Sequence, residues 1–174
     1  MKKLLFLAIA FCLSAAWLVI AQEAGHPSLG KDAPVFKLDL LDGGTCDLSA
    51  LKGKKIIVLD FWATWCPPCR KALPILAEVT AGYADKDVVF YAVNISEEKD
   101  KINAFLAKEK IKCNVALDKD AAVAKLYNVD GIPQSVIIGK DGLVQVVHVG
   151  LVADLKDKLK KELEDLIAGK SLVK

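Results

Sequence analysis

The chain has 174 residues, of which 53% are apolar, and 24 lysines and arginines stand against 22 aspartates and glutamates. This length fits one domain with a single core. Because Arg70 is the only arginine and no basic stripe occurs, the composition gives no support to nucleic-acid binding, which requires a surface that neutralises phosphates.

The first 21 residues are typical of an export segment. Lys2 and Lys3 precede an uncharged run from Leu4 to Ala21, which ends in the compact residues that a signal peptidase reads. The run of 18 residues also reaches the lower limit for crossing a bilayer, so a cleaved signal peptide and a retained membrane anchor both stay open. Either alternative places the rest of the chain outside the cytoplasm, where disulfides persist.

The exported part divides into a linker, a domain and a tail. Residues 22–34 are rich in glycine and proline and predict a linker, residues 35–168 form the domain, and residues 169–174 are a short tail. Within the domain, residues 35–40 alternate apolar and polar side chains as a half-buried strand does, and the Asp-Gly-Gly turn that follows indicates a hairpin.

The middle of the domain alternates strands and helices. "IIVLDF" at 56–61 is a continuous apolar run that predicts a strand buried on both faces, and residues 88–94 predict a second one. A helix is expected from about Pro67 and another from Ser96-Glu97-Glu98, where acids suit a first turn. The apolar positions expected on these two helices are Leu73, Leu76, Val79 and Tyr83, then Ile102, Phe105 and Leu106.

The last third continues the alternation, followed by a hairpin and a final helix. A short strand at 113–117 and a short helix at 119–127 precede two strands, 135–139 and 143–149, which flank a Lys-Asp-Gly turn. A final helix carries one leucine stripe: Leu155, Leu159, Leu163 and Leu166. The order predicts an α/β fold with a central mixed sheet flanked by helices.

Cys66 and Cys69 form the most informative motif, within "DFWATWCPPCR" at 60–70. A purely structural disulfide across so small a loop would stabilise the chain little. A zinc site needs four ligands, usually from two such pairs, and His26 and His148 are isolated, so we expect no metal site. A redox pair accounts for more of the residues.

The redox interpretation assigns separate roles to the two thiols. Cys66 would lie just before a helix, whose free N–H groups and dipole stabilise a thiolate nucleophile. Cys69 would lie one turn later on the same side and resolve the mixed disulfide. Pro67 suits the first helical turn, and Pro67 and Pro68 both lack an N–H group, which should tune the reduction potential.

Three further residues leave alternatives open. Asp60 ends an apolar strand, and it is either a buried carboxyl that shuttles protons or an acid that reaches water or caps a turn. Cys46 and Cys113 lie outside the motif, and they are either free buried thiols or partners in a second, structural disulfide.

The chain resembles the thioredoxin superfamily, and within it the exported TlpA/ResA-like thiol–disulfide oxidoreductases. Three blocks carry the resemblance: "FWATWCPPCR", "GIPQS" at 131–135 and "GKDGLVQVVHVG" at 139–150. It covers roughly residues 30–165. It implies a thioredoxin fold with an N-terminal β-hairpin and an inserted helix and strand at 97–117.

The resemblance also implies roles for single residues. Pro133 matches the family's cis-proline, beside which substrate main chain pairs with Ile132, and Asp60 matches the buried acid that shuttles protons. Trp65, Pro67 and Pro68 lie around the substrate. The remaining matches are Trp62, which we expect to pack in the core, and Pro74, which would kink the helix. One departure is Ala72, because many relatives carry a glutamate there.

The expected function is that of an extracytoplasmic thiol–disulfide oxidoreductase. By analogy it would act as a reductant in cytochrome c maturation, using the cysteine pair in place of a cofactor. Its partners would be protein thiols or disulfides and an upstream membrane electron donor, and we expect a monomer. Two rival functions are a thioredoxin-fold peroxidase, which needs a threonine-rich cysteine site, and a copper or haem delivery module, in which only His148 could assist the thiols.

Overall fold

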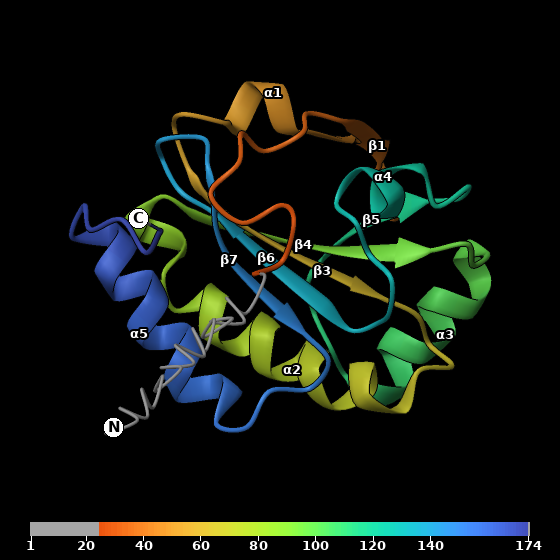
Figure 1. Cartoon of the computed structure of the whole chain (residues 1–174). Coiled ribbons are helices and arrows are strands. Elements are labelled where there is room, and N and C mark those ends of the chain that lie inside the picture. Colours follow the sequence, from red (N-terminus) through yellow and green to blue (C-terminus); the bar gives the residue numbers. More distant parts are fainter. Residues whose placement is uncertain (1–24, 174) are drawn as a thin grey trace, which may run out of the picture.

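A five-stranded mixed sheet forms the centre of the domain (Figure 1). The computed structural model describes residues 25–173, so the predicted signal or anchor lies outside the described residues. The strand order is β5-β4-β3-β6-β7; β3 is parallel to β4, β4 is parallel to β5, and β6 is antiparallel to both of its neighbours. The strands are β3 (Ile56–Trp62), β4 (Val88–Ile95), β5 (Asn114–Asp118), β6 (Gln134–Ile138) and β7 (Val144–Val149).

The central strand β3 is buried along its whole length, as its continuous apolar run predicts. Its alternate side chains enter two separate cores. Ile56 and Val58 pack on one face of the sheet, and Ile57 and Leu59 pack on the other. Asp60 belongs by this alternation to the face of Ile56 and Val58.

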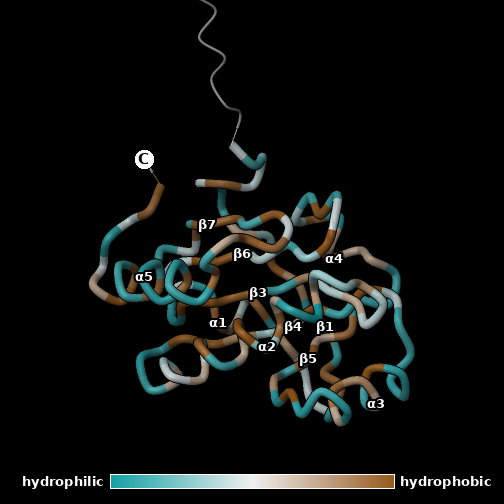
Figure 2. Tube along the Cα trace, turned by 90° about the horizontal axis from the view of Figure 1, so that it is seen from below, coloured by the Kyte–Doolittle hydropathy of each residue, from teal (hydrophilic) through white to brown (hydrophobic). Residues whose placement is uncertain are grey.

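Helices cover both faces of the sheet (Figure 1). The face that carries Ile56 and Val58 packs against α2 (Pro67–Ala81), α3 (Lys99–Glu109) and α5 (Leu155–Ile167). The opposite face packs against α1 (Leu48–Leu51) and α4 (Ala122–Leu126), and a short 3₁₀ turn, η1 (Ala84–Lys86), follows α2. Figure 2 shows that α5 alternates hydrophilic and hydrophobic residues, and its four predicted leucines are buried.

The two outer strands are partly covered. The predicted hairpin, β1 (Lys37–Asp39) and β2 (Thr45–Asp47), is antiparallel and lies beside β5, where Leu41 N donates to Val115 O at 2.9 Å. At the other edge, the described part of the expected linker is held against the start of β7: Val144 N donates to Lys31 O and Ala33 N to Gly142 O, both at 2.9 Å.

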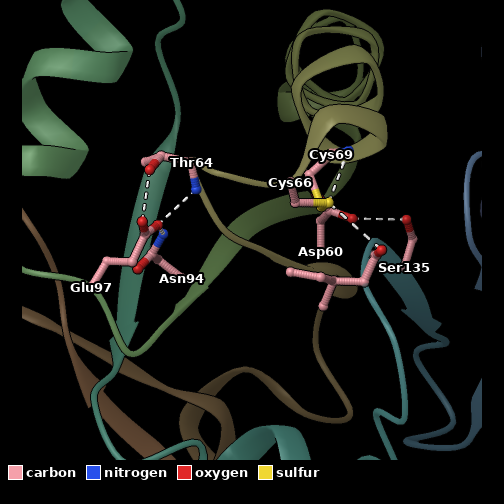
Figure 3. The surroundings of a disulfide bond; sticks show 8 residues. Asp60, Thr64, Cys66, Cys69, Asn94, Glu97 and Ser135 are labelled. Atoms are coloured by element: carbon pink, nitrogen blue, oxygen red, sulfur yellow. Dashed lines mark hydrogen bonds between the residues drawn. A yellow bond between two sulfur atoms is a disulfide. The ribbon is translucent and has the colours of Figure 1, made fainter.

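The start of α3 corrects the sequence prediction. The helix begins at Lys99, not at Ser96, and Ser96 adopts a left-handed conformation with φ 56°. Glu97 does not serve as a first-turn acid because its carboxylate is bound to Thr64 near the cysteine pair (Figure 3). The short helix α4 is also narrower than the predicted range of 119–127.

Within residues 25–173, none of the helices is both long and apolar enough to cross a membrane.

Candidate active site

Cys66 and Cys69 form a disulfide at the N-terminus of α2, with their Cα atoms 5.3 Å apart (Figure 3). Cys66 is the N-cap residue, and its Sγ accepts a hydrogen bond from Cys69 N at 3.3 Å. Pro67 occupies the first helical position, where its missing N–H group leaves no intrahelical hydrogen bond unmade. The pair therefore lies at the positive end of the helix, as predicted.

The two sulfurs differ in how they meet the surface. Cys69 has no exposed area, whereas Cys66 is 3% exposed and its neighbour Trp65 is 66% exposed. Cys66 Sγ lies 3.6 Å from Ile132 O, and the Ile132–Pro133 bond is cis, as the resemblance implies. An incoming chain can thus approach Cys66 between an exposed indole and the Ile132 main chain, while Cys69 stays behind it.

Asp60 is fully buried on the sheet face that carries α2 (Figure 3). Ser135 Oγ donates to its Oδ1 at 3.0 Å, and Oδ2 has no hydrogen-bond partner among the described residues. Burial raises the pKa of Asp60 to about 8, although the Ser135 hydrogen bond acts in the opposite direction. The alternative that Asp60 reaches water or caps a turn is therefore wrong.

Of the two tryptophans near the cysteine pair, Trp65 is exposed and Trp62 packs in the core. Trp62 is fully buried, and its ring centroid lies 5.4 Å from that of Phe105 on α3, so its expected packing role is confirmed. The guanidinium of Arg70 lies over the ring of Phe105, 5.7 Å from its centroid, and forms an ion pair with Glu109. Ala72 is buried, so this chain has no carboxylate at that position of α2.

Glu97 is a site residue that the sequence reasoning missed. Its carboxylate accepts hydrogen bonds from Thr64 N at 2.7 Å, Thr64 Oγ1 at 2.6 Å and Asn94 Nδ2 at 2.9 Å, and Lys101 Nζ lies at 2.7 Å. Burial raises the pKa of Glu97, but these hydrogen bonds outweigh burial and hold it below its usual value. Thr64 is two residues before Cys66, so Glu97 fixes the loop that carries the nucleophile.

Cys46 and Cys113 are free thiols in this structure, so the second, structural disulfide is not formed. Cys46 packs in the core on one face of the sheet, and Cys113 packs against the core on the other face. Burial raises the pKa of each thiol to about 12. Both are therefore poor nucleophiles at neutral pH.

His148 bears on the possibility of a metal site. His148 Nε2 lies 2.9 Å from Glu162 Oε2 on α5, so one ring nitrogen is engaged by a carboxylate. Between residues 25 and 173, no group of three or more candidate ligand side chains gathers in a way that could hold a metal ion.

Comparison with known proteins places this site in a family. The family model described as Redoxin matches residues 28–167. The thiol-disulfide oxidoreductase ResA of Bacillus subtilis is 33% identical over 150 residues, which cover 85% of this chain and 83% of ResA. The thioredoxin-like protein YneN of the same organism is 36% identical over 137 residues, or 78% and 76% of the two chains.

The chain belongs to the Redoxin family. Within this family it is a TlpA/ResA-like thiol–disulfide oxidoreductase of the thioredoxin superfamily.

Similar solved structures confirm the thioredoxin fold. A putative thiol:disulfide interchange protein DsbE from Chlorobium tepidum has a TM-score of 0.73 and 33% identity, covering 80% of this chain and 97% of its own. A secreted Mycobacterium tuberculosis disulfide oxidoreductase homologous to Escherichia coli DsbE has a TM-score of 0.65 and 26% identity, covering 75% and 96%.

Proposed function

We propose that this protein is an exported reductant of protein disulfides, with Cys66 as the nucleophile and Cys69 as the resolving thiol. The observation that carries the proposal is the asymmetric pair at the N-terminus of α2. Cys66 borders the exposed Trp65, Cys69 is fully buried, and the buried Asp60 lies on the sheet face beneath them.

The reaction proceeds in two exchanges. In the reduced protein, the Cys66 thiolate attacks one sulfur of a substrate disulfide, and the other substrate sulfur leaves as a thiolate. Cys69 then loses its proton to Asp60 and attacks Cys66 Sγ, which releases the second substrate thiolate. Two electrons pass from the protein to the substrate, and the product is the Cys66–Cys69 disulfide of this structure.

Asp60 suits the second exchange because its pKa of about 8 lies close to that of a thiol. A carboxylate of ordinary acidity would be a weaker base toward Cys69. The base is the ionised form of Asp60, which is the minor form at neutral pH and grows as the pH rises toward 8. We propose that Ile132 and Pro133 form the docking edge for substrate main chain, with Trp65, Pro67 and Pro68 around it. The carbonyl of Ile132 lies 3.6 Å from Cys66 Sγ, which supports this placement.

The proposed location is the outer side of the cytoplasmic membrane, with electrons supplied by a membrane donor and the protein acting as a monomer. The charged start and apolar run of residues 1–21 support export, and one structural relative is described as secreted. A role in cytochrome c maturation is the expected physiological use. The cysteine pair serves as the redox group, without a separate cofactor.

Insulin reduction by the full exported chain tests the proposal. Cys66→Ser should abolish turnover, and Cys69→Ser should accumulate a mixed disulfide that a non-reducing gel detects, because the resolving step is lost. Cys46→Ser and Cys113→Ser are matched controls, since both thiols are free and have a pKa raised to about 12, and they should retain activity.

Turnover by Cys66→Ser would refute the assignment. Copper titration of the reduced protein separates the carrier alternative, which predicts tight stoichiometric binding by Cys66 and Cys69 and loss of binding in His148→Ala. The contact of His148 with Glu162 disfavours that alternative.

A further inference from the structure

A row of buried polar side chains crosses the sheet beside the cysteine pair. In the strand register, Asp60 on β3 lies opposite Ser135 on β6, and Ser135 lies opposite His148 on β7. Directly opposite residues of antiparallel strands point to the same face of a sheet. The three residues therefore share the face covered by α2 and α5, and their exposed fractions are only 0%, 5% and 7%.

The row ends near solvent. Ser135 Oγ donates to Asp60 Oδ1 at 3.0 Å, and His148 Nε2 lies 2.9 Å from Glu162 Oε2 on α5. The side chain of Glu162 is 13% exposed, which is more than any other member of the row. The Cβ atoms of opposite residues such as Ser135 and His148 lie about 4.5–5.5 Å apart, a step that the imidazole or one water can bridge.

Asp60 needs such a connection because the cysteine pair does not provide one. After Cys69 resolves the mixed disulfide, Asp60 holds a proton while both Asp60 and Cys69 have no exposed area. Its strand neighbour on β4 is Ala92, which cannot accept a proton. The charge of Asp60 also contributes to the raised pKa of Cys113, which is about 12. A thiol that weakly acidic stays protonated, so Cys113 has no role in releasing the proton of Asp60.

We propose that Ser135, His148 and Glu162 form the route by which protons pass between Asp60 and solvent. This inference rests on the role proposed for Asp60. When Asp60 is protonated, the Ser135 hydroxyl turns to accept from Asp60 and donate toward His148. The Asp60 carboxyl then gives its proton to Ser135 Oγ while the hydroxyl proton of Ser135 moves to His148, and His148 passes a proton to Glu162 and water. No electron moves in these steps, and Ser135 recovers its hydroxyl by rotation.

Stopped-flow tryptophan fluorescence during oxidation of the reduced, full exported chain measures the rate of the resolving step. Ser135→Ala and His148→Ala should each slow it by roughly tenfold or more, since positioned proton transfer contributes about 10²–10⁴-fold. Ser135→Thr keeps the hydroxyl and should restore the rate, and free imidazole should rescue His148→Ala. Glu162→Gln should slow the step, whereas Glu164→Gln, whose carboxylate contacts Tyr83 instead, should not.

Two further measurements distinguish a route from a structural role. The reduction potential of His148→Ala should equal that of the unaltered protein, because a route changes a rate and not an equilibrium. If Asp60→Asn is slow while Ser135→Ala and His148→Ala react at the unaltered rate, the route is overturned and the role of Asp60 stands. If Asp60→Asn itself reacts at the unaltered rate, the proposed role of Asp60 fails and the route fails with it.

Discussion

At the scale of single residues, Asp60 shows a conflict between stability and chemistry. Its carboxyl is fully buried and holds one hydrogen bond, from Ser135. Burial raises the pKa of Asp60 from 3.8 to about 8. Between these two values the folded protein binds a proton that the unfolded chain has lost, so the free energy of unfolding falls as the pH rises from about 4 to about 8.

Asp60→Asn should therefore stabilise the oxidised protein at alkaline pH. The amide can still accept from Ser135, and it carries no charge to bury. The gain in unfolding free energy should be small near pH 4 and reach on the order of 5 kcal/mol above pH 8, since the pKa rises by about four units and each unit corresponds to about 1.4 kcal/mol. Urea denaturation at several pH values measures it.

A matched control is Asp39→Asn, which alters an exposed acid on β1 and should follow the pH dependence of the unaltered protein. Equal stability of Asp60→Asn and the unaltered protein across this pH range would contradict the assigned burial energetics.

At the scale of elements, the connection between β4 and α3 holds the loop of the nucleophile. Glu97 lies in this connection and binds Thr64, 33 residues earlier in the chain. This long-range contact explains why local reasoning placed the start of α3 too early: the acids suit a first turn, but no nearby signal shows that Glu97 has a distant partner. Spacing did predict the strands and the leucine stripe of α5, because their burial follows from local periodicity.

The residues of the candidate site also differ in whether the sequence alone could predict them. Cys66 and Cys69 could be predicted from a short motif and the strand before it. The sequence pattern leaves the burial of Asp60 open, and only the family resemblance favours it. The cis bond at Pro133 was expected only through the family resemblance. Ser135 could not be assigned a role from the sequence, since its contact with Asp60 depends on strand register.

Glu97→Gln should loosen the loop before Cys66. The amide nitrogen cannot accept from Thr64 or Lys101, so we expect a loss of about 1–3 kcal/mol of unfolding free energy at neutral pH and slower insulin reduction. Because the pKa of Glu97 is held below its usual 4.5, its contribution is present above that pH and is lost in stronger acid. In thermal unfolding, Glu97→Gln should unfold at a lower temperature than the unaltered protein at pH 7, and the two unfolding temperatures should converge at pH 3.

Glu98→Gln is the matched control, because its side chain is exposed one residue further along the chain. If the two variants unfold alike at pH 7, Glu97 does not anchor the loop.

At the scale of the whole molecule, both edges of the sheet are partly covered by segments from the N-terminal part of the chain. The β1–β2 hairpin lies beside β5, and residues 30–33 pair with the start of β7. An uncovered edge strand offers free N–H and C=O groups to other chains. Residues 30–33 therefore belong to the fold, although they lie in the segment 22–34 whose glycines and prolines are typical of a linker.

Truncation tests the importance of this cover. A chain that begins at residue 35 loses the hydrogen bonds to Val144 and Gly142 and the buried Ala33, so it should unfold at a lower temperature and associate at high concentration. A chain that begins at residue 25 keeps these contacts and should remain as stable as the exported protein. Differential scanning calorimetry and sedimentation measure the two effects, and equal behaviour would show that the cover is dispensable.

The placement of the remaining thiols on opposite faces of the sheet has a practical consequence for following this protein in cells. Cys46 is buried and Cys113 is half-buried, and the pKa of each is raised to about 12. A maleimide added briefly to the folded protein at neutral pH should leave both unlabelled, because neither thiol ionises there, and should mark Cys66 when its disulfide is open, whereas Cys69 has no exposed area. The mass added in such a pulse would then report the redox state of the protein, with one label on the reduced form and none on the oxidised form.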